Sequence, residues 1–271
     1  MNPVTSLARG IIPLAVRKRA ATWLGRQSWL PERQWRSVEL IRDLAQRDPE
    51  AYHRFLWSRH LGYAESYEPQ LRFGSSNLRP ERELLLNDLR FHLGDDVRAI
   101  QSVLEVGCSL GHLLRAAETE LFTRATVLDG FDIDEYAVHE GERWLQGHNS
   151  RIRLMVADMD DMDATPALAA RYDVVMCAGV LMYVRERAAA RVVHTMLRRT
   201  GRLLVLSGLA CPSCDNRHLP ISRMRASDGA FIHNLDDMIG EAGGSVVFRR
   251  WSGTAPPGWN APYFIFCRPR A

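Results

Sequence analysis

The chain has 271 residues, of which 46% are hydrophobic and 25% are charged, with a formal net charge of +3. A chain of this length holds one large α/β domain plus an appended segment, and its composition is ordinary for a globular protein. A charge so small and mixed argues against binding to nucleic acid through electrostatics alone, so we expect no nucleic-acid partner.

The first 31 residues carry positive charge and no acidic residue. Their cations are Arg9, Arg17, Lys18, Arg19 and Arg26. Apolar residues between positions 11 and 24 lie among these cations, so one hypothesis is peripheral contact with an anionic membrane surface. Pro13 interrupts the helical pattern, and a solvated basic tail is the alternative.

The sequence predicts neither a signal peptide nor a membrane span. The apolar run 11–16 is short and lacks a small-residue cleavage site, and the longest apolar stretch, 174–184, suits a buried strand. Five cysteines without regular spacing agree with a reducing compartment. We therefore expect a cytoplasmic protein, while the oligomeric state stays open.

Between positions 31 and 93 the apolar residues follow a helical period. Leu40, Ile41 and Leu44, for example, share one face. We predict an N-terminal helical cap over residues 1–98.

From Ser102 onward, short β-branched or apolar runs alternate with helical segments, which is typical of a parallel sheet with crossover helices. The predicted strands are 102–106, 126–131, 152–157, 172–178 and 202–207. The predicted helices are 111–121, 135–146, 185–198 and 234–242.

Two further runs, 245–251 and 263–267, close the chain. Their connection is rich in Gly and Pro and too short for a crossover helix, so these strands should pair antiparallel. We therefore predict an α/β fold over residues 99–271. It is a Rossmann-like seven-stranded sheet of five parallel strands plus an antiparallel C-terminal hairpin, flanked by helices.

The segment Val103–Arg115, VLEVGCSLGHLLR, ends the first predicted strand and opens the next helix. In a doubly wound sheet a nucleotide-like ligand lies at this strand end, because small residues let the backbone approach it. Gly107 permits a tight turn there, and Gly111 permits close packing at the start of the helix.

These residues resemble the first motif of the class I S-adenosylmethionine-dependent methyltransferases, acidic-x-Gly-x-Gly-x-Gly. Glu105, Gly107 and Gly111 match it, whereas Ser109 stands where the middle glycine is most usual. The resemblance continues in the family's order to about residue 268, and it implies a methyltransferase with S-adenosyl-L-methionine as its cofactor. The implied cofactor-binding residues are Glu105, Gly107, Cys108, Ser109, Gly111, Asp132, Ile133, Asp158, Met159, Cys177 and Ala178.

The resemblance also implies individual roles. Asp132 ends the second strand, where the family's acid accepts hydrogen bonds from both ribose hydroxyls, a task that suits two acceptor oxygens. Asp158 ends the third strand, where the family's carboxylate meets the adenine amino group, and Met159 would pack on the ring. Residues 177–184 are similar to the family's segment at the methyl end of the cofactor.

Other interpretations stay open. Asp132 or Asp134 could cap the next helix, and Asp158 could close a turn. A nicotinamide-dependent oxidoreductase shares the doubly wound sheet, although its Gly-x-Gly-x-x-Gly fingerprint is not met. A binding module that kept the fold without the activity is a further alternative.

Methyl transfer from a sulfonium is an in-line displacement, so the enzyme must hold the acceptor behind the methyl group and exclude water. It needs no metal, and we predict none. Our candidates for a catalytic base are Tyr183 and His233. Further candidates are His60, Tyr63, Tyr67 and His112. For each of them, packing or helix capping is the alternative.

The acceptor should enter over the fourth and fifth strands, beneath the loop 209–230. Arg217, Arg223 and Arg225 in this loop could meet a phosphate or a carboxylate, or could form a solvated surface. We expect a small-molecule acceptor, in particular a sugar-linked or lipid-linked biosynthetic intermediate.

The same loop contains an isolated CxxC motif, Cys211 and Cys214, with His218 four residues beyond. These three residues could be ligands for zinc. Because no second pair stands at zinc-ribbon spacing, we interpret the motif as a loop with two thiols.

Overall fold

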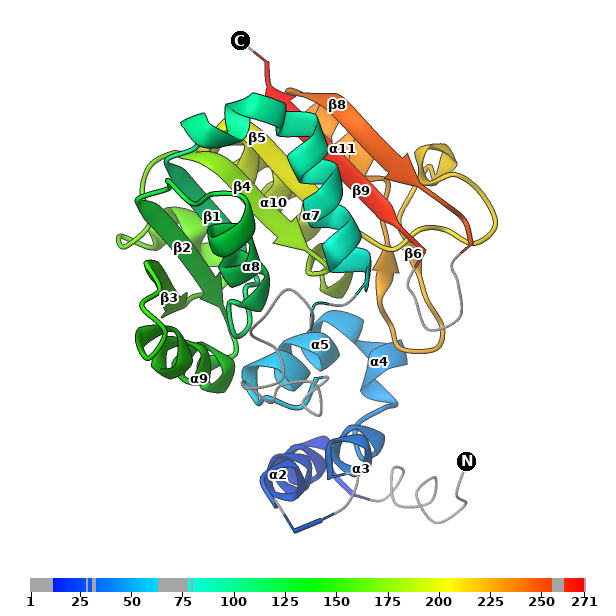
Figure 1. Cartoon of the computed structure of the whole chain (residues 1–271). Coiled ribbons are helices and arrows are strands. Elements are labelled where there is room, and N and C mark those ends of the chain that lie inside the picture. The colour runs from blue at the N-terminus through cyan, green and yellow to red at the C-terminus, as the bar shows by residue number, and fades with distance from the viewer. Residues whose placement is uncertain are drawn as a thin grey trace.

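The computed structural model describes residues 12–27, 29–30, 33–62, 78, 80–254 and 261–270. Seven strands form one sheet in the order β3-β2-β1-β4-β5-β9-β8 (Figure 1). Their bounds are β1 Ser102–Val106, β2 Val127–Asp132, β3 Ile152–Val156, β4 Tyr172–Ala178, β5 Thr200–Ser207, β8 Gly244–Trp251 and β9 Tyr263–Pro269.

The strand pairing confirms the predicted fold class. Strands β1 to β5 pair in parallel, and the order reverses between β1 and β4, where a crevice forms at the carboxyl ends of the strands. Strand β9 is antiparallel to both β5 and β8, which is the predicted C-terminal hairpin.

Helices cover both faces of the sheet. On one face α7 Pro80–Leu93 and α8 His112–Glu120 pack on the strands, and on the other face α10 Glu186–Arg199 and α11 Leu235–Glu241 do so (Figure 1). A further helix, α9 Glu135–Gln146, packs against β3 and β2. The result is a three-layer α/β/α arrangement with one buried cluster on each side of the sheet.

Helix α7 belongs to the sheet's own hydrophobic core. Leu85, Leu86 and Leu89 are buried in one cluster with Val103 of β1 and Leu114 of α8. The sequence predicted a boundary between a cap and the sheet domain at residues 98 and 99. That boundary would cut through this cluster. Helix α7 packs as part of the sheet layer rather than with the helices that precede it.

The helices before α7 form a separate cluster. They are α2 Leu14–Gly25, α3 Arg33–Glu39, α4 Leu44–Arg47 and α5 Pro49–Ser58. Ala21, Ile41 and Tyr52 are buried at their centre. In Figure 1, α5 lies beside the carboxyl ends of the strands, whereas α2 and α3 lie farthest from the sheet.

Short elements that the sequence did not predict fill the connections. They are the 3-10 helices η3 Gly94–Ala99, η4 Met159–Ala164, η5 Leu181–Tyr183 and η6 Asn216–His218, and the two-residue strands β6 Arg223–Met224 and β7 Phe231–Ile232. Strands β6 and β7 pair antiparallel in a small separate ribbon, with β6 inside the predicted loop 209–230 and β7 directly after it. Elements this short carry too few residues to show a period.

Gly141 lets helix α9 approach the glycine loop. A Cβ at this position would lie 2.3 Å from the backbone oxygen of Leu110 and 2.8 Å from Leu154. Gly240 in α11 has no heavy atom within 4 Å of the same position. A methyl group therefore has room at Gly240 but not at Gly141.

We predict that Gly141→Ala lowers the free energy of unfolding by about 2 kcal/mol, because overpacking against the backbone outweighs the gain in helix propensity. In contrast, Gly240→Ala should raise stability by about 0.5 kcal/mol. Urea denaturation followed by circular dichroism measures both changes. Equal effects of the two substitutions would show that α9 does not pack closely on the glycine loop.

Candidate active site

A cavity opens at the carboxyl ends of β1, β2, β4 and β5. Its walls come from the sheet, from α5 and from α7. The residues from α5 and α7 are Glu50, Arg54, Trp57, Glu81, Arg82 and Leu85. Those from the sheet side include Gly107, Ser109, His112, Asp132, Ile133, Asp158, Met159, Ala178, Gly179, Val180, Met182, Tyr183, Leu209, Pro262 and Phe264.

The glycine loop lines this cavity with backbone in the left-handed region. Gly107 has φ +73°, and a Cβ there would lie 2.3 Å from a methyl carbon of Val180. Gly111, at φ +79°, precedes the first residue of α8. Ser109 also has positive φ, at +53°, which is uncommon for a residue with a side chain. Its hydroxyl oxygen is buried and has no hydrogen-bond partner among the described residues.

The carboxylate of Asp132 holds the loop in place. Its Oδ2 accepts the backbone N–H of Ser109 at 2.8 Å, and its Oδ1 accepts that of Asp134 at 2.9 Å. Burial raises the pKa of the Asp132 carboxyl to about 6. The charge of the nearby Asp134 carboxylate also raises this pKa, whereas the N–H donors lower it. Asp134 itself caps α9 by accepting the N–H of Ala137 at 3.0 Å.

Three predicted cofactor residues lie behind the cavity wall. Glu105 is buried, and its Oε2 accepts the N–H of Leu114 at 3.0 Å, which anchors the first turn of α8. Burial raises the pKa of Glu105 to about 8. Cys108 and Cys177 are fully buried, and burial raises the pKa of both thiols. These side chains therefore support the loop and the strand from within the core.

Asp158 is bound by a residue from the N-terminal helices. Its Oδ2 accepts a hydrogen bond from Arg54 of α5, and the other guanidinium nitrogen of Arg54 reaches Asp160 at 3.0 Å. The Oδ1 atom of Asp158 accepts the N–H of Asp160 at 3.0 Å, so the residue also caps η4. This ion-pair cluster joins α5 to the end of β3.

Helix α7 contributes a second cation to the cavity, beside the glycine loop. Arg82 donates from Nη1 to His112 Nε2 at 2.7 Å. A guanidinium group always donates, so His112 Nε2 is an acceptor and the ring is held neutral in this contact. The charge of Arg82 also acts on Glu105, whose pKa it lowers against the effect of burial.

The wall that faces away from β2 is aromatic and apolar. Tyr183 lies in η5, and its ring is 5.1 Å from that of Trp57 in α5 and 4.8 Å from that of His53. Met182 and Leu209 continue the same wall. The structure thus brings the predicted Tyr183 to the cavity.

His233, the other predicted base, does not line the cavity. It is buried, its Nε2 donates to the backbone oxygen of Leu181 at 3.0 Å, and its Nδ1 accepts from the hydroxyl of Ser222 at 2.6 Å. Burial lowers its pKa. With both ring nitrogens bonded, His233 fixes the loop after β5 instead of facing a ligand.

The remaining candidates lie in several places. His112 lines the cavity, whereas His60 Nδ1 bonds the carboxylate of Asp134 at 2.7 Å outside it. Tyr63 and Tyr67 lie outside the described residues. Two of the loop arginines pair with neighbouring acids, Arg217 with Asp215 and Arg225 with Asp228, and none of the three lines the cavity.

Sequence reasoning missed Arg54, Trp57 and Arg82. Glu50, Arg54 and Trp57 are spaced i, i+4 and i+7, which places them on one face of α5. That spacing was visible in the sequence. Nothing local, however, indicated that this face would meet the carboxyl ends of the strands.

The described residues include neither a candidate metal site nor a helix that could span a membrane. Within the described ranges, no cluster of three or more His, Cys, Asp or Glu side chains could hold a metal ion. In the same part of the chain, every helix is too short or too polar to cross a membrane.

The sequence matches a known family over its central strands. Residues 103–201 match the model of the family described as "Methyltransferase domain". This range runs from β1 to the start of β5 and includes the glycine loop, Asp132 and Asp158. No curated protein matched the chain.

Solved structures share the fold at low sequence identity. The magnesium protoporphyrin IX methyltransferase of Synechocystis PCC 6803, solved with bound S-adenosylmethionine, has a TM-score of 0.56 at 16% identity, over 82% of this chain and 98% of that chain. The 1,6-didemethyltoxoflavin-N1-methyltransferase of Burkholderia thailandensis has a TM-score of 0.58 at 16% identity, over 81% and 90%. N-methyltransferase NodS of Bradyrhizobium japonicum has 0.52 at 18% identity, over 71% and 89%.

The strand order, the glycine loop at the end of β1 and the family match therefore agree. Residues 103–201 thus match the methyltransferase-domain family, and the chain has the fold of S-adenosylmethionine-dependent methyltransferases.

Proposed function

We propose that the cavity holds S-adenosylmethionine along the carboxyl ends of β1, β2 and β3, and that its methyl group is transferred to a small molecule bound beside Tyr183. The observation that carries this proposal is that one cavity joins the glycine loop, Asp132 and Asp158 to an aromatic wall. Transfer of a labelled methyl group from the cofactor to candidate acceptors tests the activity directly.

The amino-acid end of the cofactor fits beside the glycine loop. Gly107 leaves room for its close approach, and the unpartnered hydroxyl of Ser109 offers a hydrogen bond. Arg82 supplies a positive charge suited to a carboxylate, for which guanidinium groups are good donors. Neutral His112 orients this guanidinium through their 2.7 Å contact.

The nucleoside end fits along β2 and β3. Asp132 faces the cavity with two carboxylate oxygens, each of which keeps a lone pair for a ribose hydroxyl after accepting one N–H. Ile133 and Met159 border the position proposed for the adenine ring, and Asp158 would accept from its amino group. Arg54 would then share Asp158 with the base.

The acceptor fits against Trp57 and Tyr183. Their rings offer a flat surface on which a sugar ring or an apolar chain can pack, so we propose a sugar-linked or lipid-linked acceptor. None of the three loop arginines lines the cavity, so we assign none of them to the acceptor. Bound S-adenosylmethionine supplies an electrophilic methyl group, while the chain's own task is to orient the acceptor and exclude water. The hydroxyl of Tyr183 is the group we propose to bond the acceptor.

We also propose a division of labour within the chain. The sheet domain, which we extend to include α7, binds the cofactor, and α5 covers the cavity through Glu50, Arg54 and Trp57, with α2 to α4 packed in one cluster with it.

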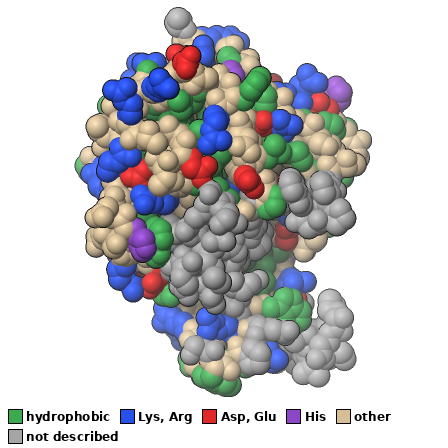
Figure 2. Space-filling view, viewed as in Figure 1, with side chains coloured by type: hydrophobic (Ala, Val, Ile, Leu, Met, Phe, Trp, Pro, Cys, Tyr) green, Lys and Arg blue, Asp and Glu red, His purple; other side chains and the backbone are tan. Residues whose placement is uncertain are grey.

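The N-terminal helices support a further proposal, that the protein binds anionic membranes peripherally. Val16, Arg19, Trp23 and Arg26 follow the spacing i, i+3, i+7 and i+10 and are all exposed, so one face of α2 alternates apolar and cationic groups. Figure 2 shows blue and green side chains together at this end of the molecule.

Other N-terminal residues do not contribute to this face. Arg17 is buried, where it donates to Leu40 at 2.9 Å and pairs with Asp43. Ile11 and Arg9 lie outside the described residues.

We predict that Arg82→Gln weakens binding of S-adenosylhomocysteine at least tenfold but leaves binding of 5′-methylthioadenosine, which lacks the amino-acid end, within about twofold. Asp132→Asn should weaken both ligands, because both carry the ribose. Isothermal titration calorimetry measures the four affinities. The matched control is Asp161→Asn, an exposed acid near Asp158 that does not line the cavity. Equal losses for both ligands in Arg82→Gln would contradict the assignment.

We predict a pH dependence that originates in Asp132. The ionised carboxylate is the form that accepts from ribose hydroxyls, and burial raises its pKa to about 6. Affinity for 5′-methylthioadenosine should therefore be nearly complete above pH 7 and fall about tenfold from pH 7 to pH 5 as this carboxylate is protonated. In Asp132→Asn the affinity should be low and independent of pH over this range. A profile that survives the substitution would assign the dependence to another group.

We predict that the protein co-sediments with phosphatidylserine vesicles more than with neutral phosphatidylcholine vesicles. Trp23→Ala and Arg19→Gln should each reduce this binding several-fold, because they remove apolar area and charge from one helix face. Phe91→Ala is the control, since Phe91 is even more exposed than Trp23 but lies on α7. If the Phe91 variant loses as much binding as the α2 variants, the surface is wrongly assigned.

A further inference from the structure

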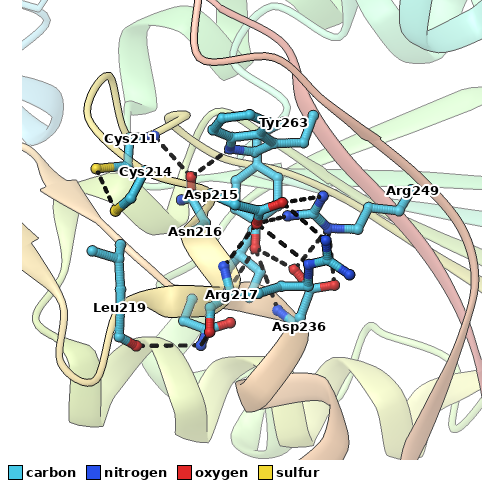
Figure 3. Close-up of polar contacts among 12 residues, drawn as sticks. Cys211, Cys214, Asp215, Asn216, Arg217, Leu219, Asp236, Arg249 and Tyr263 are labelled. Carbon is cyan, nitrogen blue, oxygen red and sulfur yellow. Dashed lines mark hydrogen bonds and ion pairs between the residues drawn. The ribbon is translucent and has the colours of Figure 1, made fainter.

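The loop that follows β5 brings two thiols together. Figure 3 shows Cys211 and Cys214 side by side at one end of a polar network, and their sulfur atoms are 3.4 Å apart. The other three cysteines, Cys108, Cys177 and Cys267, are buried in the sheet domain. Cys211 and Cys214 are thus the two cysteines that lie in the loop after β5.

A buried asparagine fixes the backbone around Cys211. Asn216 Oδ1 accepts the N–H of Cys211 at 2.7 Å and the indole N–H of Trp251 at 2.8 Å. Its Nδ2 donates to the backbone oxygens of Leu209 at 2.9 Å and His233 at 2.7 Å. These hydrogen bonds fix the backbone of Cys211, and the bend at 212–214 places Cys214 beside it.

Arg249 fixes the other end of the same turn. It pairs with Asp215 and with Asp236, and the hydroxyl of Tyr263 donates to Asp236 at 2.9 Å (Figure 3). Asp215 lies directly after Cys214, so this network limits how far the second thiol can move away from the first.

The surroundings of Cys211 favour its thiolate. Although burial opposes ionisation, hydrogen bonds from the hydroxyl and N–H of Ser213 and from Cys214 lower the pKa of the Cys211 thiol to about 7. The hydroxyl of Ser213 lies 3.4 Å from Cys211 Sγ and accepts from Arg223 at 3.4 Å. A cation therefore stands beside the dithiol.

The two thiols differ in access. Cys211 is 1% exposed, whereas Cys214 is partly exposed. An external reagent can reach Cys214 first, and Cys211 can then attack the derivatised sulfur from behind. This order is the usual division between an accessible thiol and a resolving thiol.

We propose that Cys211 and Cys214 form a thiol–disulfide exchange site that reacts with anionic low-molecular-weight disulfides such as oxidised glutathione. Arg223 suits the carboxylates of such a reagent. No step of this exchange uses the methyl-transfer cofactor.

The exchange takes two steps. The Cys214 thiol, whose pKa is raised by its hydrogen bond to Cys211, gives its proton to the Cys211 thiolate and attacks one sulfur of oxidised glutathione, which forms a mixed disulfide and releases one glutathione thiolate. Cys211, with a pKa of about 7, then loses this proton to solvent. The Cys211 thiolate then attacks the Cys214 sulfur, which forms the protein disulfide and releases the second glutathione thiolate. The two thiol protons pass through solvent to the released thiolates, so the dithiol loses two electrons and glutathione disulfide gains them.

Closing the bond requires a small movement. The sulfur atoms must approach from 3.4 Å by about 1.4 Å to reach a disulfide length. Cys211 is buried in one cluster with Leu209 and Met182, both of which line the cavity. The exchange site therefore adjoins the wall that we propose for the acceptor.

The test uses the full chain equilibrated at neutral pH in glutathione buffers of increasing oxidised fraction, followed by alkylation and tryptic mapping. Both cysteines fall in one peptide, residues 203–217. We expect this peptide to become about 2 Da lighter than its reduced form and to lose both alkylation sites, while the three buried cysteines stay reduced.

Variants separate the two thiols. Cys211→Ser should accumulate a stable glutathione adduct at Cys214, and Cys214→Ser should form neither adduct nor link. Ser213→Ala should slow closure several-fold at pH 7 because the pKa of the Cys211 thiol rises, and a thiolate absorbance titration reports that rise. Circular dichroism checks that each variant is folded. A wild-type adduct that persists at Cys214, or two thiols that stay free at every ratio, would overturn the proposal.

Discussion

The glycine-loop end of the cavity depends on the two hydrogen bonds that the carboxylate of Asp132 accepts. Through one N–H of Ser109 and one of Asp134 the carboxylate joins the loop after β1 to the turn after β2. Ser109 has a left-handed backbone that a side chain disfavours, and the hydrogen bond to Asp132 helps to hold it there. Two loops from neighbouring strands are thus set by a single side chain, which also faces the cavity.

Local periodicity was sufficient to predict the sheet. The predicted bounds of β1, β4 and α9 agree with the structure to the residue, because alternation and helical period are properties of neighbouring residues. The hairpin followed from a connection too short for a helix. The glycine loop directly follows the first predicted strand, whereas the acids at the ends of the second and third strands were identified through the resemblance to the methyltransferase family.

What the sequence could not predict depends on how distant elements dock. Arg54 and Arg82 reach the cavity only because α5 and α7 pack at the strand ends. His233 looked available in the sequence, yet Leu181 and Ser222, which lie 52 and 11 residues away, occupy both of its nitrogens. A boundary near residue 98 followed a change in sequence texture, whereas the leucines of α7 are buried with the sheet.

The pairing of Arg54 with Asp158 and Asp160 has a consequence for the helices that cover the cavity. On the proposed binding mode, adenine and α5 contact the same carboxylate. The two contacts are therefore thermodynamically linked. If cofactor binding changes the equilibrium constant for docking of α5 by some factor, docking of α5 changes the affinity for the cofactor by the same factor. Through this single aspartate, the docking of the N-terminal helices would depend on whether the nucleoside is bound.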